Sequence, residues 1–357
     1  MSERAQGWVV GVGALLAGLA VLALGLQLAG FDSAAALGAL WSGAFGSWYT
    51  ISSATLVRAV PLVIIGLGLA LAFRAGAFNI GAEGQFYAGA IAATWLGLHA
   101  GSLPPPLAAA VVLCGAFLAG AFWVAVPVLL RVRYGVLEVI STLLLNFVAE
   151  AGTSLVVQGP LQESQGIYPQ SDAIAVSARL SLLPGTRLHA GILLALAGAV
   201  LFRYLFARTL WGFQLRAVGL GPRAAEVSGR IDSRWMVAAA LAISGAIAGL
   251  AGGIEVAGVS YALFQNLSPG YGFTAIAVAL LGRLDPLGVV VAGLLFGALE
   301  AGAGAMQREA GVPAVAVYVV EAVVILVVLL AESVRRGGMR SLAAIGSGTG
   351  APGEARR

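Results

Sequence analysis

The sequence FRAGAFNIGAEGQ, residues 73–85, places an amide, a carboxylate and a glutamine among glycines in an otherwise strongly apolar chain. Polar groups inside a membrane are costly and usually serve a function. A glutamate there needs a protein partner, a water-filled cavity or a proton. Glycines permit the close backbone approach and the helix breaks that such a cavity requires. We therefore take Phe78, Asn79, Glu83 and Gln85 as candidates for a substrate path.

The composition around this stretch predicts an all-α polytopic membrane protein. Hydrophobic residues make up 60% of the chain and charged residues only 10%, and the mean hydropathy is +0.95. In soluble proteins about a quarter of the residues are charged. The 357 residues are enough for about ten spans of ~20 residues in one membrane domain, with broken or re-entrant segments. Apolar runs predict helices at 8–28, 50–72, 80–98, 107–130, 138–158, 189–207, 235–257, 262–282, 287–306 and 313–331.

The basic residues predict the orientation of these helices. All 20 of them are arginines, and with a cytoplasmic N-terminus 16 would lie inside and only Arg58, Arg179, Arg187 and Arg308 outside. The positive-inside rule therefore places both termini in the cytoplasm. The absence of lysine excludes nucleotide hydrolysis by a P-loop, which needs its lysine on the phosphates.

Other residue types argue against chemistry carried out by this chain. The single cysteine, Cys114, excludes an intramolecular disulfide, and His99 and His189 lie at predicted span edges and indicate no metal site. The sequence contains no HExxH motif and no nucleophile elbow. We expect no catalytic residue, no metal and no cofactor bound by this chain.

Two predicted connections are long. Residues 159–188 form an external loop that could contact an extracytoplasmic partner, or act as a lid without one. Residues 208–234 face the cytoplasm, and Pro222 suits the start of a short surface helix that Gly229 ends. We expect residues 1–335 to form the membrane domain and 336–357 a disordered cytoplasmic tail.

Small-residue pairs at Gly245 and Gly249, and at Gly293 and Gly297, would let helices touch. Packing within one subunit is favoured here over a dimer interface.

Polar residues within the spans allow more than one interpretation. Asn79 and Glu83, four residues apart, would share a helical face, with Gln85 pointing elsewhere. These groups could bind a sugar hydroxyl or a nucleobase edge, with Phe78, Phe86 or Tyr87 as stacking surfaces; equally, they could brace a broken helix. Asn146, a fifth candidate for the substrate path, lies mid-span with Glu150 one turn along. For these and for Glu255, Glu300 and Glu321, interhelical hydrogen bonding is favoured over a proton relay.

Three stretches carry a family resemblance. AFRAGAFNIGAEGQ (72–85), STLLLNFVA (141–149) and AIAVALLGRLDPLG (275–288) resemble the permease subunits of ATP-binding cassette (ABC) importers. The likeness covers roughly residues 50–335. It points to the branch that handles simple sugars, nucleosides and branched-chain amino acids, and is closest to the nucleoside type.

This resemblance implies partners and a location. It implies a dimer with a second permease, either a related chain or a second copy, in the inner membrane of a prokaryote and in contact with its lipid. ATPase subunits that use ATP and Mg would dock from the cytoplasm, and an extracytoplasmic binding protein would deliver substrate; no nucleic acid is implied. The stretch 216–231 resembles the ATPase-coupling element, which would comprise Arg216, Arg223, Ala224, Ala225, Glu226, Gly229 and Arg230.

Two other functions remain open at this point. A ribose-like simple sugar could replace the nucleoside as substrate. A proton-coupled secondary transporter is the less favoured alternative, which the intramembrane glutamates could serve.

Overall fold

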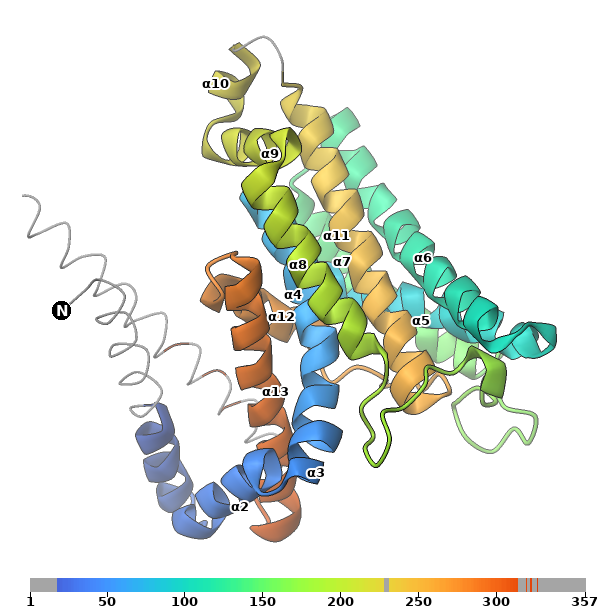
Figure 1. The fold of residues 1–357 in the computed structure, drawn as a ribbon, viewed down its shortest axis with the longest axis vertical. Helices are drawn as coiled ribbons and strands as arrows, with labels where there is room; N and C mark the ends of the chain where they lie inside the picture. The colour runs from blue at the N-terminus through green and yellow to red at the C-terminus, as the bar shows by residue number, and fades with distance from the viewer. Residues whose placement is uncertain (1–17, 228–230, 314–318, 320–321, 323–325, 327–357) are drawn as a thin grey trace, which may run out of the picture. The chain divides into compact units, whose positions relative to one another are not determined.

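The computed structural model describes residues 18–227 and 231–313, together with residues 319, 322 and 326. Within these residues the chain is helical and contains no β-strand, only two isolated bridges (Figure 1). Six of the described helical segments are long and apolar enough to cross a membrane: Trp48–Arg74, Pro105–Tyr134, Glu138–Val157, Gly191–Arg208, Ser233–Ser260 and Pro286–Glu309. The prediction of an all-helical membrane protein is confirmed.

The helices follow most of the predicted spans. In chain order they are α2 (Ser33–Phe45), α3 (Trp48–Thr50), η1 (Ile51–Thr55), α4 (Leu56–Arg74), α5 (Ala82–His99), η2 (Ala100–Ser102), α6 (Pro105–Tyr134), α7 (Glu138–Val157), η3 (Val176–Ala178), α8 (Gly191–Arg208), α9 (Leu210–Leu220), α10 (Pro222–Val227), α11 (Ser233–Glu255), η4 (Val256–Ser260), α12 (Tyr271–Leu281) and α13 (Pro286–Glu309). A helix over Gly18–Leu28 precedes them. Of these segments, η1 and η4 are π-helical turns.

Two predicted spans differ from the structure. The run 262–282 is not one helix, because α12 begins only at Tyr271, after Pro269 and a left-handed Gly270 with φ of +99°. Proline and a left-handed glycine both interrupt helices. Conversely, α2 lies between predicted spans. The run 313–331 lies almost entirely outside the described residues.

The chain divides into two compact units. The larger runs from Ala39 to Ala305, and the smaller combines Met1–Gly38 with Met306–Arg357. Of the smaller unit, the structure describes the Gly18–Leu28 helix, the start of α2, residues 306–313 and three isolated positions. The candidate residues of the substrate path and of the coupling element belong to the larger unit.

The larger unit has inner and outer helices. Helix α11 packs against α4, α5 and α6, and α5 also packs against α6 and α7. In the spans that contain α4 and α11, 78% and 72% of the most apolar stretch is buried, against 22% in α6 and 28% in α7 and in α8. The outer helices therefore present leucine, valine and phenylalanine outward, as helices facing lipid do.

Close packing of the inner helices depends on small residues. A Cβ atom added at Gly249 would lie 2.7 Å from the Cα atom of Gly120, and one added at Gly293 would lie 2.5 Å from a side-chain carbon of Val63. These contacts join α11 to α6 and α13 to α4. The predicted packing of the glycine pairs within one subunit is thus what the structure contains.

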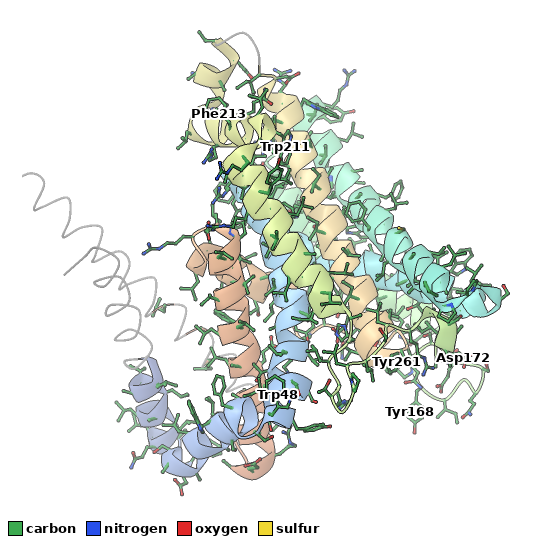
Figure 2. All side chains as sticks on the ribbon, viewed as in Figure 1. Trp48, Tyr168, Asp172, Trp211, Phe213 and Tyr261 are labelled. Atoms are coloured by element: carbon green, nitrogen blue, oxygen red, sulfur yellow. The ribbon has the colours of Figure 1, made fainter. Side chains whose placement is uncertain are left out.

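Aromatic side chains lie at both ends of this unit. Trp48 and Tyr168 lie toward one end, and Trp211 and Phe213 toward the other (Figure 2). Of these, Trp48, Tyr168 and Phe213 are more than half exposed. Aromatic residues at both ends of a helical bundle are typical of the two membrane–water interfaces.

Candidate functional site

The quoted stretch forms an interruption between two helices. Helix α4 ends at Arg74, α5 begins at Ala82, and the residues between them are not helical. Their backbone N–H and C=O groups need partners where the segment is buried, as at Ala77, Asn79 and Gly81. The backbone at the end of α4 supplies partners for residues 75–77, and side chains supply those for residues 78, 80 and 81.

Asn79 and Gln85 form a reciprocal amide pair inside the protein. Asn79 Nδ2 donates to Gln85 Oε1 at 2.8 Å, and Gln85 Nε2 donates to Asn79 Oδ1 at 3.0 Å. Asn79 Nδ2 also donates to Ser244 Oγ on α11, and Asn79 Oδ1 accepts from Gly81 N. The exposed fraction is 0% for Asn79 and 1% for Gln85. The pair closes the start of α5 and ties it to α11.

This pairing overturns the expected arrangement. Asn79 precedes α5, so Asn79 and Glu83 do not share a helical face, and Gln85 turns toward Asn79 rather than elsewhere. The expectation treated residues 79 to 83 as parts of one helix, whereas α5 begins only at Ala82. The helix break places Asn79 where its short amide can accept from the N–H group two residues on.

Asn146 of α7 binds the interruption at two points. Its Nδ2 donates to Ile80 O at 2.8 Å, and its Oδ1 accepts from Gly84 N at 2.8 Å. One side chain thus satisfies an acceptor in the interruption and a donor in the first turn of α5. A buried asparagine with both ends bonded holds two helices in one register.

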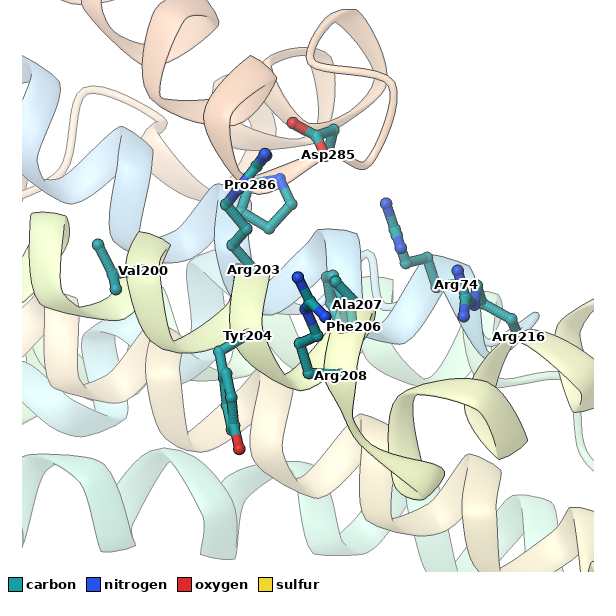
Figure 3. Close-up of a pocket in the computed structure, with 10 residues that line it drawn as sticks. All are labelled: Arg74, Val200, Arg203, Tyr204, Phe206, Ala207, Arg208, Arg216, Asp285 and Pro286. Atoms are coloured by element: carbon teal, nitrogen blue, oxygen red, sulfur yellow. The ribbon is translucent and has the colours of Figure 1, made fainter.

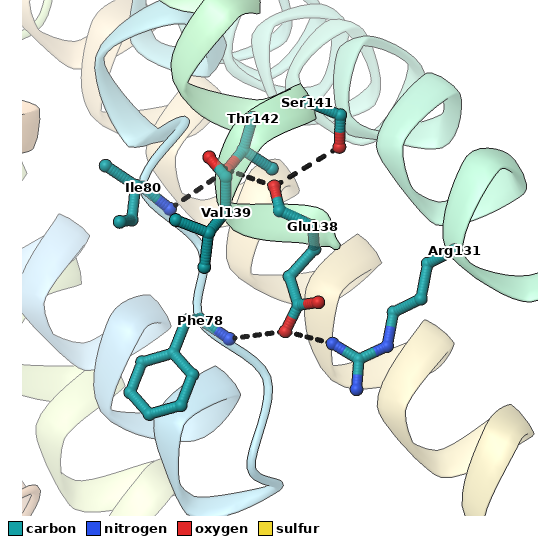
Figure 4. A network of polar contacts seen from close by, with 7 residues as sticks. All are labelled: Phe78, Ile80, Arg131, Glu138, Val139, Ser141 and Thr142. Atoms are coloured by element: carbon teal, nitrogen blue, oxygen red, sulfur yellow. Dashed lines mark hydrogen bonds and ion pairs between the residues drawn. The ribbon is translucent and has the colours of Figure 1, made fainter. Parts of the chain in front are cut away.

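Glu138 and Thr142 extend this contact along α7 (Figure 4). Phe78 N donates to Glu138 Oε1 at 3.1 Å, and Ile80 N donates to Thr142 Oγ1 at 3.3 Å. The Glu138 carboxylate also forms an ion pair with Arg131 of α6. The sequence analysis did not select Glu138 or Thr142, although positions 138, 142 and 146 repeat every four residues and therefore share one face of a helix.

Glu83 joins α5 to a helix far along the chain. Its Oε2 accepts from Gly272 N, at the start of α12, at 2.6 Å. A carboxylate at a helix N-terminus is favoured by the unpaired N–H groups and by the helix dipole. Nearby, Tyr87 Oη accepts from Ser268 N at 3.3 Å, and Ser268 Oγ accepts from Tyr271 N at 3.0 Å. The polar side chains of α5 therefore order the turn that precedes α12.

The aromatic candidates differ in exposure. Phe86 is fully buried and Tyr87 is 3% exposed, so neither offers a stacking surface, whereas Phe78 is 52% exposed. Among the other candidate carboxylates, Glu255 is buried, Glu150 is exposed and Glu300 is intermediate. Glu321 lies outside the described residues.

The segment 208–234 contains two helices rather than one. Thr209 caps α9, since its Oγ1 accepts from Gly212 N at 3.1 Å, and Arg216 lies within α9. The predicted short helix is α10, Pro222–Val227. The sequence analysis expected only the short helix that begins at Pro222 in this connection. The additional helix α9 buries Gly212, Leu215 and Val218 on one side.

Side chains of α10 face different ways. Ala225 is 6% exposed and turns toward its own chain, while Ala224 is exposed and Val227 is 87% exposed. Glu226 Oε1 accepts from Ser233 Oγ at the start of α11. Of the residues expected in the coupling element, Ala225 is therefore buried against its own chain, whereas Ala224 and Val227 are on the exposed side. Gly229 and Arg230 lie outside the described residues.

A cavity of about 500 Å³ lies beside α8 and α9 at the same end (Figure 3). The charged residues around it are Arg74, Arg203, Arg208, Arg216 and Asp285. No three His, Cys, Asp or Glu side chains in the described part of the chain come together as a metal site.

The loop 159–188 folds back onto the helices. Ser171 N donates to Leu263 O at 2.9 Å, Ile174 N to Tyr261 O at 2.8 Å, and Leu180 N to Ala257 O at 2.8 Å. Arg179 places its guanidinium 4.6 Å from the Tyr261 ring centre. The loop is therefore an ordered cover over η4 and the turn that follows it.

Hydrogen bonds within this loop lower the pKa of two carboxyls. Gln170 and Tyr168 N donate to Glu163, and both the hydroxyl and the N–H group of Ser164 donate to Asp172. Each pKa lies below its usual value chiefly because of these bonds.

Comparison with known families gives these features a context. Residues 51–329 match the family model described as branched-chain amino acid transport system / permease component. The chain belongs to this permease family. The resemblance seen in the sequence is thereby confirmed.

Relatives of this permease transport different solutes. The guanosine ABC transporter permease NupP of Bacillus subtilis is 37% identical over 94% of this chain and 97% of its own. The glucose ABC transporter permease TsgB13 of Haloferax volcanii is 37% identical over 90% of this chain and 87% of its own. The nucleoside ABC transporter permease NupB of Lactococcus lactis is 32% identical over 88% and 86%.

The family defines the kind of protein. The permease is a multi-pass subunit of an ABC transporter in the inner membrane, and it is a transport subunit rather than an enzyme. ATP hydrolysis belongs to partner ATPases. No bond is made or broken by this chain. Its polar residues therefore serve to hold the helices in place, to guide the solute or to take part in conformational change.

Proposed function

We propose that this permease forms the translocation pathway of a nucleoside importer. The observation that carries the proposal is the likeness to NupP, named a guanosine permease, over nearly the whole of both chains. NupB, named a nucleoside permease, supports the same substrate class. A nucleoside combines a base, which can stack on an aromatic ring, with polar edges that bond to amides.

The interrupted segment between α4 and α5 is the proposed path element. Non-helical backbone is tolerated at membrane depth where it lies within protein or lines a water-filled cavity. Phe78 offers an exposed ring there, while Asn79, Glu83, Gln85 and Asn146 hold the segment in shape through the contacts given above. We assign these four residues to positioning the path rather than to strong substrate binding.

The proposed topology has about ten membrane helices with both termini in the cytoplasm. Residues 1–335 form the membrane domain and 336–357 its cytoplasmic tail. The support is the arginine distribution, 16 on one side against 4 on the other. In this orientation α9 and α10 face the cytoplasm and the loop 159–188 faces outward.

The proposed partners follow from this orientation. ATPase subunits, which use ATP and Mg, dock on α9 and α10, and a binding protein delivers substrate to the outer face. No cofactor is bound by this chain. The second permease is either a related chain or a second copy. A related chain is favoured, because this permease is 37% identical to NupP and also 27% identical to NupQ, two guanosine permease proteins of one organism.

ATPase stimulation tests the substrate class. The whole transporter, with its binding protein and in lipid, should hydrolyse ATP several times faster with guanosine or adenosine than without. Glucose, ribose and leucine should leave the basal rate unchanged. Stimulation by glucose or ribose alone would transfer the permease to the sugar branch.

The sugar alternative rests on one specific observation, the 37% identity to TsgB13, named a glucose permease. The proton-coupled alternative is tested by uptake into vesicles that contain the same transporter. Uptake that stops when ATP is removed, and continues when the membrane is depolarised, excludes proton coupling.

A further inference from the structure

The cavity in Figure 3 combines charged and apolar walls. Val200, Arg203, Tyr204 and Arg208 come from α8, and Arg216 comes from α9. The end of α4 and the turn before α13 close the other side, through Arg74 and Asp285. With a volume of about 500 Å³, the cavity is large enough for a small polar headgroup.

The charge around the cavity is strongly positive. Four arginines face one carboxylate. Arg74 has partners: its Nε donates to Leu284 O at 2.8 Å, and its guanidinium lies 4.3 Å from the Phe206 ring centre. Within the part of the chain that the structure describes, no hydrogen bond or ion pair reaches the guanidinium groups of Arg203, Arg208 or Arg216. Like charges around one hollow repel each other unless an anion lies between them.

The apolar wall of the cavity indicates that such an anion would be part of a lipid. Val200 is 68% exposed and Tyr204 is 59% exposed, and both lie on the outward side of α8. Only 28% of the most apolar stretch of this helix is buried, so its outward side faces lipid. Val200 and Tyr204 lie four residues apart, so they follow one face of the helix toward its arginine-rich end. The cavity therefore opens onto the exposed apolar side of α8.

We propose that this cavity binds the phosphate headgroup of an anionic phospholipid. Arg203, Arg208 and Arg216 hold the phosphate, Tyr204 lies at the level of the headgroup, and an acyl chain runs along Val200. Basic pockets between membrane helices are suited to such headgroups. A soluble phosphate would use the same arginines but would gain nothing from the apolar wall.

A bound lipid would also influence the interrupted helix. Arg74, the last residue of α4, forms part of the cavity and hydrogen-bonds to the turn that contains Leu284. The headgroup would thus connect α8 and α9 to the end of α4, directly before residues 75–81. This inference does not depend on which solute the permease carries.

Lipid titration of the complete transporter tests the proposal. The complex is reconstituted in phosphatidylcholine nanodiscs, and binding of labelled phosphatidylglycerol is measured for the wild type, Arg203→Gln, Arg208→Gln and the double variant. Each substitution should weaken binding about fivefold, and the double variant roughly 25-fold. Arg133→Gln, an exposed arginine at the end of α6, is the matched control and should bind lipid like the wild type.

Further arms identify the source of the anion and guard against misfolding. Arg203→Lys with Arg208→Lys keeps the charge and should restore most of the binding. Millimolar inorganic phosphate should not displace the lipid; displacement would show a soluble-anion site and overturn the proposal. Unchanged lipid binding in the Gln double variant would also overturn it, whether or not that variant keeps its ATPase.

Discussion

At the scale of single residues, the polar side chains in the interruption mainly satisfy backbone groups. Asn79 and Asn146 each bond to both a donor and an acceptor of the segment or its neighbours, and Glu83 accepts from the first turn of α12. An unpaired buried backbone group costs about 1–3 kcal/mol, so removal of any one of these side chains should destabilise the structure around it. Their contacts support bracing of the broken helix, with Phe78 as the exposed member.

Glu83 gives the sharpest residue-level prediction. Glu83→Ala removes the acceptor for Gly272 N and should destabilise the α5–α12 contact by roughly 1–3 kcal/mol. Nucleoside uptake should fall at least severalfold while the protein still inserts into the membrane. Uptake in vesicles and thermal unfolding of the purified permease measure the two effects.

A second substitution separates bracing from charge. Glu83→Gln keeps an acceptor oxygen and should retain more stability than Glu83→Ala, whereas Glu309→Ala, an exposed carboxylate at the end of α13, should resemble the wild type. Normal uptake and stability in Glu83→Ala would show that the contact is dispensable.

At the scale of elements, α10 is proposed to transmit work from the ATPase. Its exposed side carries Ala224 and Val227, while Ala225 is buried in the chain itself. Val227→Asp should place an unpaired carboxylate in the docked interface, which is costly when desolvated. We expect this variant to insert normally but to lose copurification with the ATPase and to lose uptake.

Two comparisons make the α10 test specific. Ala225→Asp should instead lower the stability of the permease, because the new charge enters its own packing. Val176→Asp, an exposed site in the loop 159–188, should keep the ATPase bound. If Val227→Asp retains the ATPase and transports at the normal rate, α10 is not the coupling element.

The loop 159–188 should respond to acid. The pKa of Asp172 is lowered from its ordinary 3.8 and that of Glu163 from 4.5, chiefly by hydrogen bonds from Ser164 and Gln170. A lowered pKa means that the ionised carboxylate stabilises the folded loop at higher pH, and that this contribution is lost as the pH falls through the folded-state pKa. The loop should therefore become less ordered at pH values below the ordinary pKa values of these two carboxyls, and should stay ordered near neutral pH.

Hydrogen exchange measures this response. After correction for intrinsic rates, amide protection of residues 163–172 should be lower at about pH 3 than at about pH 6. Protection of α6, which contains no carboxylate, should not change. Asp172→Asn should lose the part of the pH dependence that Asp172 contributes and keep the part due to Glu163. Equal protection of the wild-type loop at both pH values would contradict the prediction.

At the scale of the whole molecule, the orientation is open to a labelling test. Val176 is 76% exposed and Val227 is 87% exposed, on segments that the proposed topology places on opposite faces. In a Cys114→Ser background, Val176→Cys should react with an impermeant thiol reagent from outside and Val227→Cys only after the membrane is opened. Removal of Cys114 is needed because it is exposed. Equal labelling of both cysteines from one side would contradict the topology.

The sequence alone determined the class of this protein. Its composition predicted a helical membrane protein, its motifs predicted the permease family, and its apolar runs placed most helices within a few residues, for example α7 at 138–157. These properties are local: a long apolar run without helix-breaking residues satisfies its own backbone groups in lipid as a helix wherever its neighbours lie. The break between α4 and α5 was likewise signalled by its glycines and polar residues.

Only the tertiary structure decided what those residues contact. Asn79 pairs with Gln85 and Ser244, Ala225 turns inward, and arginines from α4, α8 and α9 surround one cavity. Each of these depends on which helices become neighbours, and periodicity within one segment says nothing about the segment that it meets. Hydrogen bonds and charge clusters between distant segments arise from packing, and therefore became visible only once the chain was folded.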